Sequence, residues 1–222
     1  MPRVARIAPG GLIYHVLNRG VGKMKLFRSG KDFEAFQRCL VATQKSTPVR
    51  MLAYCVMNNH WHLVLWPEND GDLARFMLRL TTMHVRRWLI NRHQVGSGHV
   101  YQGRYKSFAI QNDAHLAIAC RYVERNPVRA GAAESSAQWP WGSAGQASLP
   151  VALRVDLAEL PIARRGDWRH WVDQPQTAAE EEALNRCVRQ SRPFGDERWL
   201  KRMHTTLGWR EPLKIGRPKK RK

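Results

Sequence analysis

Acidic residues are scarce in this chain. Its 222 residues include 18 aspartates and glutamates against 37 lysines and arginines, for a net charge of +19. Such a field attracts polyanions, whose phosphate groups are bound by Lys and Arg side chains. Composition by itself leaves DNA, RNA and an anionic membrane surface open as partners.

Long apolar runs are also missing. No stretch approaches the roughly 18 apolar residues that a membrane span requires. The first residues, 1–6, lack the apolar run of a signal peptide. A hydrophobic content of 43% and a mean hydropathy of −0.51 are typical of a globular chain. We therefore expect a cytoplasmic, nucleoid-associated protein with no membrane partner.

Cysteine is rare, and its spacing indicates no shared role. The chain contains no Cys-x-x-Cys pair, and its four cysteines all lie among apolar residues: Cys39, Cys55, Cys120 and Cys187. This pattern argues against a disulfide framework and against a thiolate zinc site. We expect small buried hydrophobic side chains in a reducing compartment.

The chain does contain a regular alternation of predicted strands and helices. Strands are expected over 11–18, 49–57 and 60–66, with a fourth ending at 110. Helices are expected over 33–45 with Asp32 as the N-cap, over 72–92, and from Asn112 or Asp113 to 125. The first six elements match the split βαβ pattern. We therefore predict an α+β fold, a ferredoxin-like antiparallel sheet with helices on one face, followed by an added helix.

The periodicity weakens after residue 145, which predicts three parts. Residues 1–145 are expected to form the main domain, and 146–176 a linker or wrapping segment. Residues 177–222 are expected to form a small helical, basic extension, because Thr177 and Glu180 make a capping box. Its tail contains Gly-Arg-Pro at 216–218, which resembles an AT-hook. A disordered basic tail that adds only non-specific affinity is the alternative interpretation.

The most informative motif is a His-x-His pair at the start of the third predicted strand. Because side chains alternate along a strand, His60 and His62 share one face and Trp61 lies on the other. Two imidazoles on one face are a ready pair of metal ligands. An isolated pair of this kind is more often a polar sheet face, so a second motif is needed.

That second motif lies on the last helix of the main domain. Tyr122 and Asn126 are four residues apart and hence neighbours on one helix face. A tyrosine there could simply pack against the sheet. Together with the histidine pair it predicts an active site, because a tyrosine that attacks a phosphodiester needs a divalent cation nearby. Asn126 would then supply a third ligand on the helix of the nucleophile.

These two motifs together resemble a known family. Met57-x-Asn59-His60-x-His62-Leu63 and Tyr122-x-x-x-Asn126-Pro127-Val128-Arg129-Ala130-Gly131 resemble the one-tyrosine HUH transposases, in particular the REP-associated tyrosine transposases. The resemblance implies that His60 and His62 bind Mg²⁺ or Mn²⁺ and that Tyr122 is the nucleophile. It places Asn126 at a metal-ligand position that is Gln in some relatives.

The resemblance also implies a reaction. An HUH-type tyrosine transposase nicks and joins single-stranded DNA hairpins of the repetitive extragenic palindrome type through a 5′-phosphotyrosine, without ATP. We expect this activity in a monomer or a homodimer. Two alternatives remain: a domesticated, non-catalytic hairpin-binding protein, and a metal-dependent hydrolase that uses activated water, in which Tyr122 is incidental.

Residues for binding the DNA strand are expected in the basic and aromatic segments. The aromatic candidates are Tyr101 and Tyr105, which could stack on bases. The basic candidates could equally be solvated charges; they are Arg19, Lys23, Arg104, Lys106, Arg121, Arg129, Arg217 and Lys219.

Overall fold

A computed structural model describes residues 7–208 of the chain. Its centre is a four-stranded sheet in the order β2-β3-β1-β4, and every pairing between neighbours is antiparallel. The strands are β1 (Ile13–Arg19), β2 (Arg50–Met57), β3 (His60–Trp66) and β4 (Lys106–Ile110). This is the ferredoxin-like arrangement expected from the order of the elements, so the predicted fold class is confirmed.

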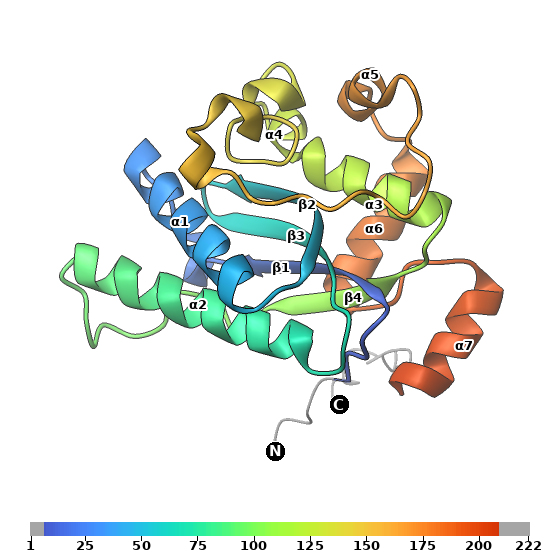
Figure 1. Ribbon diagram of the computed structural model, residues 1–222, viewed down its shortest axis with the longest axis horizontal. Coiled ribbons are helices and arrows are strands. Elements are labelled where there is room, and N and C mark those ends of the chain that lie inside the picture. The colour runs from blue at the N-terminus through green and yellow to red at the C-terminus, as the bar shows by residue number, and fades with distance from the viewer. Residues whose placement is uncertain (1–6, 209–222) are drawn as a thin grey trace, which may run out of the picture.

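Two long helices pack side by side on one face of the sheet (Figure 1). They are α1 (Gly30–Ser46) and α2 (Asp72–Asn91). They bury one set of alternating strand residues, including Val16, Trp61 and Leu63, each of which is inaccessible to solvent. Trp61 therefore lies on the face opposite to the two histidines, as the alternation along β3 predicts.

The start of α1 differs in detail from the expectation. Ser29 is the N-cap, and Asp32 is the third helical residue, whose carboxylate accepts a hydrogen bond from the backbone N–H of Ser29. The two residues form a capping box, which satisfies backbone donors at both positions. Asp32 therefore stabilises the helix start from inside the first turn rather than from the N-cap.

The other face of the sheet is covered by α3 (Ala114–Glu124), which begins at Asp113 as expected. The helix stops before Asn126, where a short helix α4 (Asn126–Arg129) begins. The break has a local cause, because Pro127 has no N–H to continue the hydrogen-bond ladder of α3. Tyr122 and Asn126 consequently lie on two successive helices rather than on one.

The segment after the main domain follows the exposed edge of the sheet. The backbone N–H of Ala158 donates to Met51 in β2, and Gln44 in α1 bonds the backbone of Asp156. The 3₁₀ turn η2 (Ser136–Gln138) precedes the segment, and two more 3₁₀ turns, η3 (Gln146–Ser148) and η4 (Val151–Leu153), lie within it. Edge strand β2 is thus covered by its own chain, which shields its backbone groups from other strands.

Three further helices complete the described chain. They are α5 (Trp168–Asp173), α6 (Ala178–Gln190) and α7 (Glu197–Leu207). Helix α6 packs on α3 and β4, where it buries Leu184 and Cys187 in the same core as α3. In Figure 1, α7 lies beyond the β4 edge of the sheet. None of the helices within residues 7–208 has the length and apolar character to cross a membrane.

Candidate active site

The two histidines of the His-x-His motif lie in the middle of the sheet. His60 pairs with Arg19 in β1, and His62 pairs with Leu17 and, on the other side, with Cys55. The two rings stand 5.0 Å apart, centroid to centroid, and perpendicular to each other. The strand places both side chains on the face covered by α3, as predicted.

One nitrogen of each ring is already engaged. Nδ1 of His60 lies 2.6 Å from Oδ1 of Asn59, and Nδ1 of His62 lies 2.8 Å from Nε2 of His15 in β1. A ring whose Nδ1–H donates the hydrogen bond keeps the lone pair of Nε2 free for a metal or a substrate. The histidine pair therefore has the fixed ring orientation that a ligand pair requires.

Burial keeps both rings uncharged. It lowers the pKa of His60 to about 4, and the neighbouring guanidinium of Arg19 acts in the same direction. It also lowers the pKa of His62 far below the ordinary value, with further contributions from His15 and His60. At neutral pH both rings are therefore neutral imidazoles with a lone pair for a cation.

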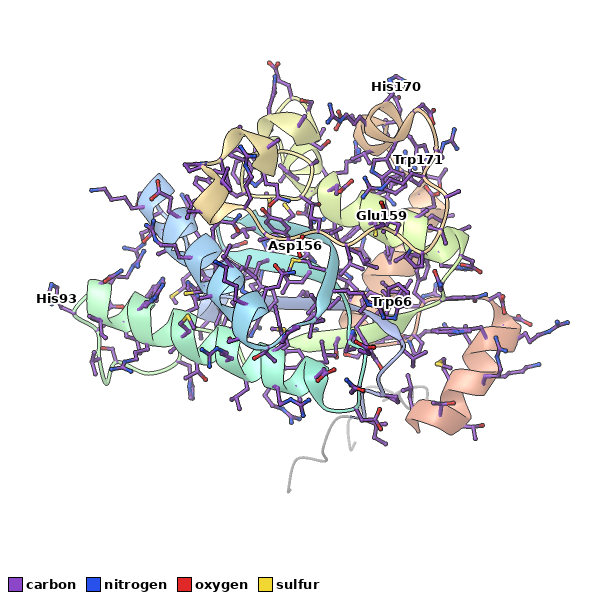
Figure 2. The ribbon with its side chains drawn as sticks, in the orientation of Figure 1. Trp66, His93, Asp156, Glu159, His170 and Trp171 are labelled. Carbon is purple, nitrogen blue, oxygen red and sulfur yellow. The ribbon has the colours of Figure 1, made fainter. Side chains whose placement is uncertain are left out.

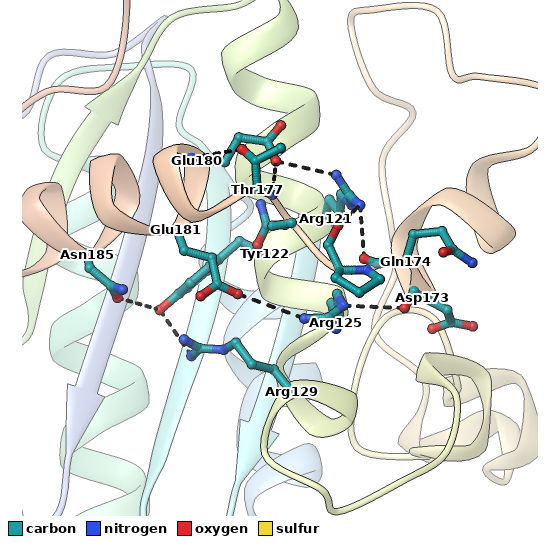
Figure 3. Close-up of polar contacts among 12 residues, drawn as sticks. Arg121, Tyr122, Arg125, Arg129, Asp173, Gln174, Thr177, Glu180, Glu181 and Asn185 are labelled. Atoms are coloured by element: carbon teal, nitrogen blue, oxygen red, sulfur yellow. Dashed lines mark hydrogen bonds and ion pairs between the residues drawn. The ribbon is translucent and has the colours of Figure 1, made fainter.

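Tyr122 lies directly against the histidines. Its ring is 5.8 Å from that of His62 and 6.1 Å from that of His15. Its hydroxyl lies 3.4 Å from Oδ1 of Asn185 in α6 and accepts a hydrogen bond of 3.2 Å from Arg129 (Figure 3). The guanidinium of Arg129 also covers the ring, at 4.7 Å from its centroid. The tyrosine predicted as the nucleophile thus has a neutral acceptor and a cation at its reactive oxygen.

Asn126 is the remaining member of the predicted group. Its side chain is 1% exposed and lies near enough to His60 to oppose the lowering of the pKa of that ring. Its amide nitrogen has no partner among the described residues. Because this nitrogen is a hydrogen-bond donor, only the amide oxygen of Asn126 could bind a cation. Within residues 7–208, no group of three His, Cys, Asp or Glu side chains is arranged to hold a metal ion, so a site built on these histidines would need the amide of Asn126 or ligands from outside the protein.

His60, His62 and Tyr122 line a cavity of about 550 Å³, whereas Asn126 does not. Several basic residues line it together with His60, His62 and Tyr122, namely Arg19, Arg104, Lys106, Arg129 and Arg189. The Nε of Arg19 is buried and has no hydrogen-bond partner among the described residues. The cavity therefore combines two neutral imidazoles, a tyrosine hydroxyl and a positively charged wall, which suits a phosphate group.

Three of the expected strand contacts do not fit that role. The ring of Tyr101 is 7% exposed, and its hydroxyl binds Trp61 and His84 in the core under α2. Arg121 is 5% exposed and donates to the backbone oxygens of residues 174 and 175. Tyr105 packs partly buried against the core on the α1 side. Tyr101 and Arg121 are therefore occupied by protein partners, and none of the three side chains lines the cavity that contains Tyr122.

Arg121 has a structural role in place of the expected one. Its guanidinium lies 4.5 Å from the ring of Trp171 and 3.6 Å from the carboxylate of Glu180. Trp171 projects from α5 toward α3 (Figure 2). Arg121 thus joins α3 to α5 and to the start of α6 (Figure 3).

The remaining expected contacts divide into two groups. Lys23 is exposed at the end of the 3₁₀ turn η1 (Val21–Lys23) and does not line the cavity. Arg217 and Lys219, with the Gly-Arg-Pro tail, lie outside the described residues.

Three residues close to Tyr122 or His62 were not predicted from the sequence: His15, Asn185 and Arg189. The position of His15 could have been predicted in part, because alternate residues of its β-rich segment share one face of the sheet. Asn185 and Arg189 lie on a helix distant in the sequence, which gives no such indication.

Comparisons with known proteins identify the family of this chain. Residues 10–126, more than half of the chain, match the family model described as "Transposase IS200 like". A Haemophilus influenzae protein assigned to the REP-associated tyrosine transposases is 28% identical over 116 residues, which are 49% of this chain and 66% of that protein. The REP-associated tyrosine transposase of Escherichia coli is 19% identical over 162 residues, 70% of this chain and 92% of the relative.

A solved structure gives the same indication for the fold. The structure of a REP-associated tyrosine transposase bound to a REP hairpin superposes with a TM-score of 0.52 at 19% identity, covering 74% of this chain and 98% of the other. The matched residues 10–126 contain His60, His62, Tyr122 and Asn126. The chain belongs to the IS200-like transposase family.

Proposed function

We propose that this protein is a metal-dependent transposase that cleaves and rejoins single-stranded hairpin DNA through a 5′-phosphotyrosine on Tyr122. One observation carries the proposal: the Tyr122 ring lies 5.8 Å from that of His62, in a cavity with a basic wall. An enzyme that acts on chromosomal hairpins works in the cytoplasm, at the nucleoid. The hairpin in the related structure makes hairpins of the REP type the first substrates to test.

Different residues around the cavity would bind the DNA and the cation. Arg19, Arg104 and Lys106 would hold the phosphate backbone, since guanidinium and ammonium groups bind phosphate oxygens. His60, His62 and Asn126 would hold Mg²⁺ or Mn²⁺. When bound there, the cation supplies charge neutralisation at the scissile phosphate. Because the protein ligands carry no charge, phosphate oxygens can complete the site.

Formation of the phosphotyrosine conserves all atoms. The Tyr122 oxygen forms a bond to phosphorus as the bond between phosphorus and the 3′-oxygen breaks. The phenol proton leaves the tyrosine, and the departing 3′-oxygen takes up a proton to become a hydroxyl. Arg129, 3.2 Å from the tyrosine oxygen, stabilises the negative charge that develops there. The reverse reaction, with the same or another 3′-hydroxyl, joins strands without ATP because the phosphotyrosine conserves the bond energy.

A search for a covalent adduct tests the proposal. The protein is incubated with a single-stranded DNA hairpin carrying a tetranucleotide flank, with Mn²⁺ or Mg²⁺, and separated on a denaturing gel. We expect an adduct that Tyr122→Phe abolishes and that the matched variant Tyr105→Phe retains. Cleavage without an adduct would indicate a hydrolase, and an adduct that persists in Tyr122→Phe would show another nucleophile.

A second measurement separates chemistry from binding. His60→Ala should abolish cleavage and leave hairpin affinity within about twofold, because basic side chains provide most of the affinity for DNA. Cutting that survives this substitution would contradict the metal site.

One observation favours the domesticated alternative. The side chain of Tyr122 is only 4% exposed, and its hydroxyl is engaged by α6 and Arg129. A protein that only binds hairpins would bind DNA and give neither adduct nor cleaved strand in the same assay.

A further inference from the structure

His15 contacts the proposed metal ligand His62 but has no role in the chemistry described so far. It is fully buried in β1, and its Nε2 lies 2.8 Å from Nδ1 of His62. The two rings are stacked, 4.9 Å apart at an angle of 29°. Phe108 in β4 packs edge-on against the other side, also at 4.9 Å. His15 is therefore held in one orientation by two neighbouring strands.

A hydrogen bond between two ring nitrogens needs one N–H and one lone pair. Two arrangements of neutral rings satisfy it. In the first, Nδ1–H of His62 donates to Nε2 of His15, and Nε2 of His62 carries a free lone pair. In the second, Nε2–H of His15 donates to His62, whose own Nε2 then carries a hydrogen and cannot bind a cation.

His60 does not face this choice. Its Nδ1 lies 2.6 Å from the side-chain oxygen of Asn59, and a carbonyl oxygen can only accept. Nδ1 of His60 therefore carries the hydrogen, and Nε2 is left as the ligand atom. Nε2 of His62 has a free lone pair, as Nε2 of His60 has, only if His15 also acts as an acceptor.

We propose that His15 is a positioning residue that accepts the Nδ1–H of His62 and thereby leaves the Nε2 lone pair of His62 available for a divalent cation. This inference rests on the proposed function, in which His62 binds the cation. It assigns the tautomer of both rings: His62 carries its hydrogen on Nδ1, and so does His15. The Nδ1 of His15 is buried and has no partner among the described residues. No nearby group therefore imposes the opposite tautomer on the pair.

The surroundings of His15 support a positioning role over general packing. An apolar side chain would fill the space between β3 and β4 at lower cost, because burial of an imidazole carries a desolvation free energy that burial of a hydrocarbon does not. His84, the buried histidine on the other side of the sheet, has two aromatic neighbours and a tyrosine hydroxyl as partner. The one hydrogen bond of His15 is instead made to a proposed metal ligand. Residues that are hydrogen-bonded to metal ligands orient those ligands and affect metal affinity.

Two substitutions separate the hydrogen bond from the volume of the ring. His15→Gln keeps a carbonyl oxygen near the position of Nε2, whereas His15→Phe keeps the ring and removes the acceptor. We expect His15→Phe to weaken binding of Mn²⁺, added without DNA to the full-length protein, by roughly 10-fold or more. His15→Gln should remain within about threefold of the unsubstituted protein. His84→Phe, which removes a buried imidazole far from the cavity, is the control and should leave Mn²⁺ affinity unchanged.

The tautomers can be observed directly without any metal. Two-bond proton–nitrogen correlation spectra of the metal-free protein distinguish Nδ1–H from Nε2–H for each ring. We expect His62 as the Nδ1–H tautomer in the unsubstituted protein and in His15→Gln, and as the Nε2–H tautomer in His15→Phe. This measurement does not depend on activity, and the unsubstituted protein tests the inference even if a variant fails to fold.

The outcomes distinguish this inference from the proposed function. A His62 ring with Nε2–H in the unsubstituted protein would overturn the inference, as would unchanged Mn²⁺ affinity in a folded His15→Phe variant. If instead His60→Ala and His62→Ala leave Mn²⁺ affinity unchanged, the metal site itself, and with it the proposed function, is wrong.

Discussion

The hydroxyl of Tyr122 lies 3.4 Å from the side-chain oxygen of Asn185, a residue 63 positions later in the chain. The contact places helix α6 directly over the proposed nucleophile. Val188 and Arg189 of the same helix line the cavity, and Lys106 of β4 donates to the backbone oxygen of Val188. Helix α6 is consequently a wall of the cavity that contains Tyr122.

Helix α6 should also be part of the folding unit of the sheet, because Leu184 is fully buried against it. We predict that Leu184→Ala lowers the free energy of unfolding of the whole protein by about 2–5 kcal/mol, the cost of a large cavity in a core. Urea unfolding followed by tryptophan fluorescence measures it. The exposed neighbour Arg186 serves as control, and Arg186→Ala should change little. Two separate unfolding transitions, with only the second shifted, would show that the extension folds independently.

Two arginines that the sequence could not separate should behave differently. Arg104 lines the cavity, whereas Arg121 is buried against α5 and α6. Arg104→Ala should weaken hairpin binding and reduce the slope of log affinity against log salt by roughly 0.7–0.9, the value for one phosphate contact. Arg121→Ala should keep that slope and lower the melting temperature instead. Titrations at several salt concentrations, together with thermal unfolding, decide between the two; an equal loss of slope would contradict the assignment.

The carboxylate of Glu124 should be needed for stability. It is buried, which raises its pKa, and it accepts hydrogen bonds from Ser143 at 2.8 Å and from Trp168 at 2.9 Å. Glu124→Leu leaves the buried indole N–H of Trp168 without its acceptor, at a cost of about 1–3 kcal/mol, whereas the Ser143 hydroxyl can still donate to the backbone oxygen of Tyr54. Glu124→Gln can accept from Trp168 and donate to Ser143, so it should cost less than about 1 kcal/mol. Denaturant unfolding compares them; equal losses would show that packing alone matters.

The stability of the protein should fall in acid, in part because of His84. Burial lowers the pKa of this histidine to about 3, and its Nδ1 lies 2.7 Å from the Tyr101 hydroxyl. An unfolded chain has the ordinary value of about 6.5. Between these two values the unfolded state binds a proton that the folded state does not. The stabilisation is therefore complete above about pH 6.5 and is lost as the pH falls toward 3.

Substitution of His84 tests this linkage. His84→Asn keeps an acceptor for Tyr101 and should flatten the pH dependence of the unfolding free energy by about 1.4 kcal/mol per pH unit between about pH 4 and about pH 5.5. His93, which projects from the end of α2 (Figure 2), provides the control variant His93→Asn. An unchanged slope in His84→Asn would show that another group dominates the acid response.

The strands, the helices and the face of the His-x-His pair were predictable because their causes are local. Alternation along β3 places His60 and His62 on one side of the sheet whatever lies around them. The break at Pro127 is also a local effect, although its consequence, two helices in place of one, was missed.

Contacts between distant segments could not be predicted in this way. His15 and His62 are 47 residues apart, and only the register of β1 against β3 brings their nitrogens together. Tyr101 lies in a basic segment that favoured an exposed interpretation, yet the chain turns its ring into the core beside Trp61. A basic neighbourhood in the sequence does not reveal which side chains it buries.

The sequence by itself determined the order of the elements, the strongly basic charge and the residue types of the proposed site, since periodicity and composition follow from covalent neighbours. The tertiary structure alone decided which groups surround Tyr122. Asn185 reaches it because α6 packs on α3, and His15 orients His62 because two strands pair in one register. Those positions depend on the burial of whole surfaces, and burial is a property of the folded chain.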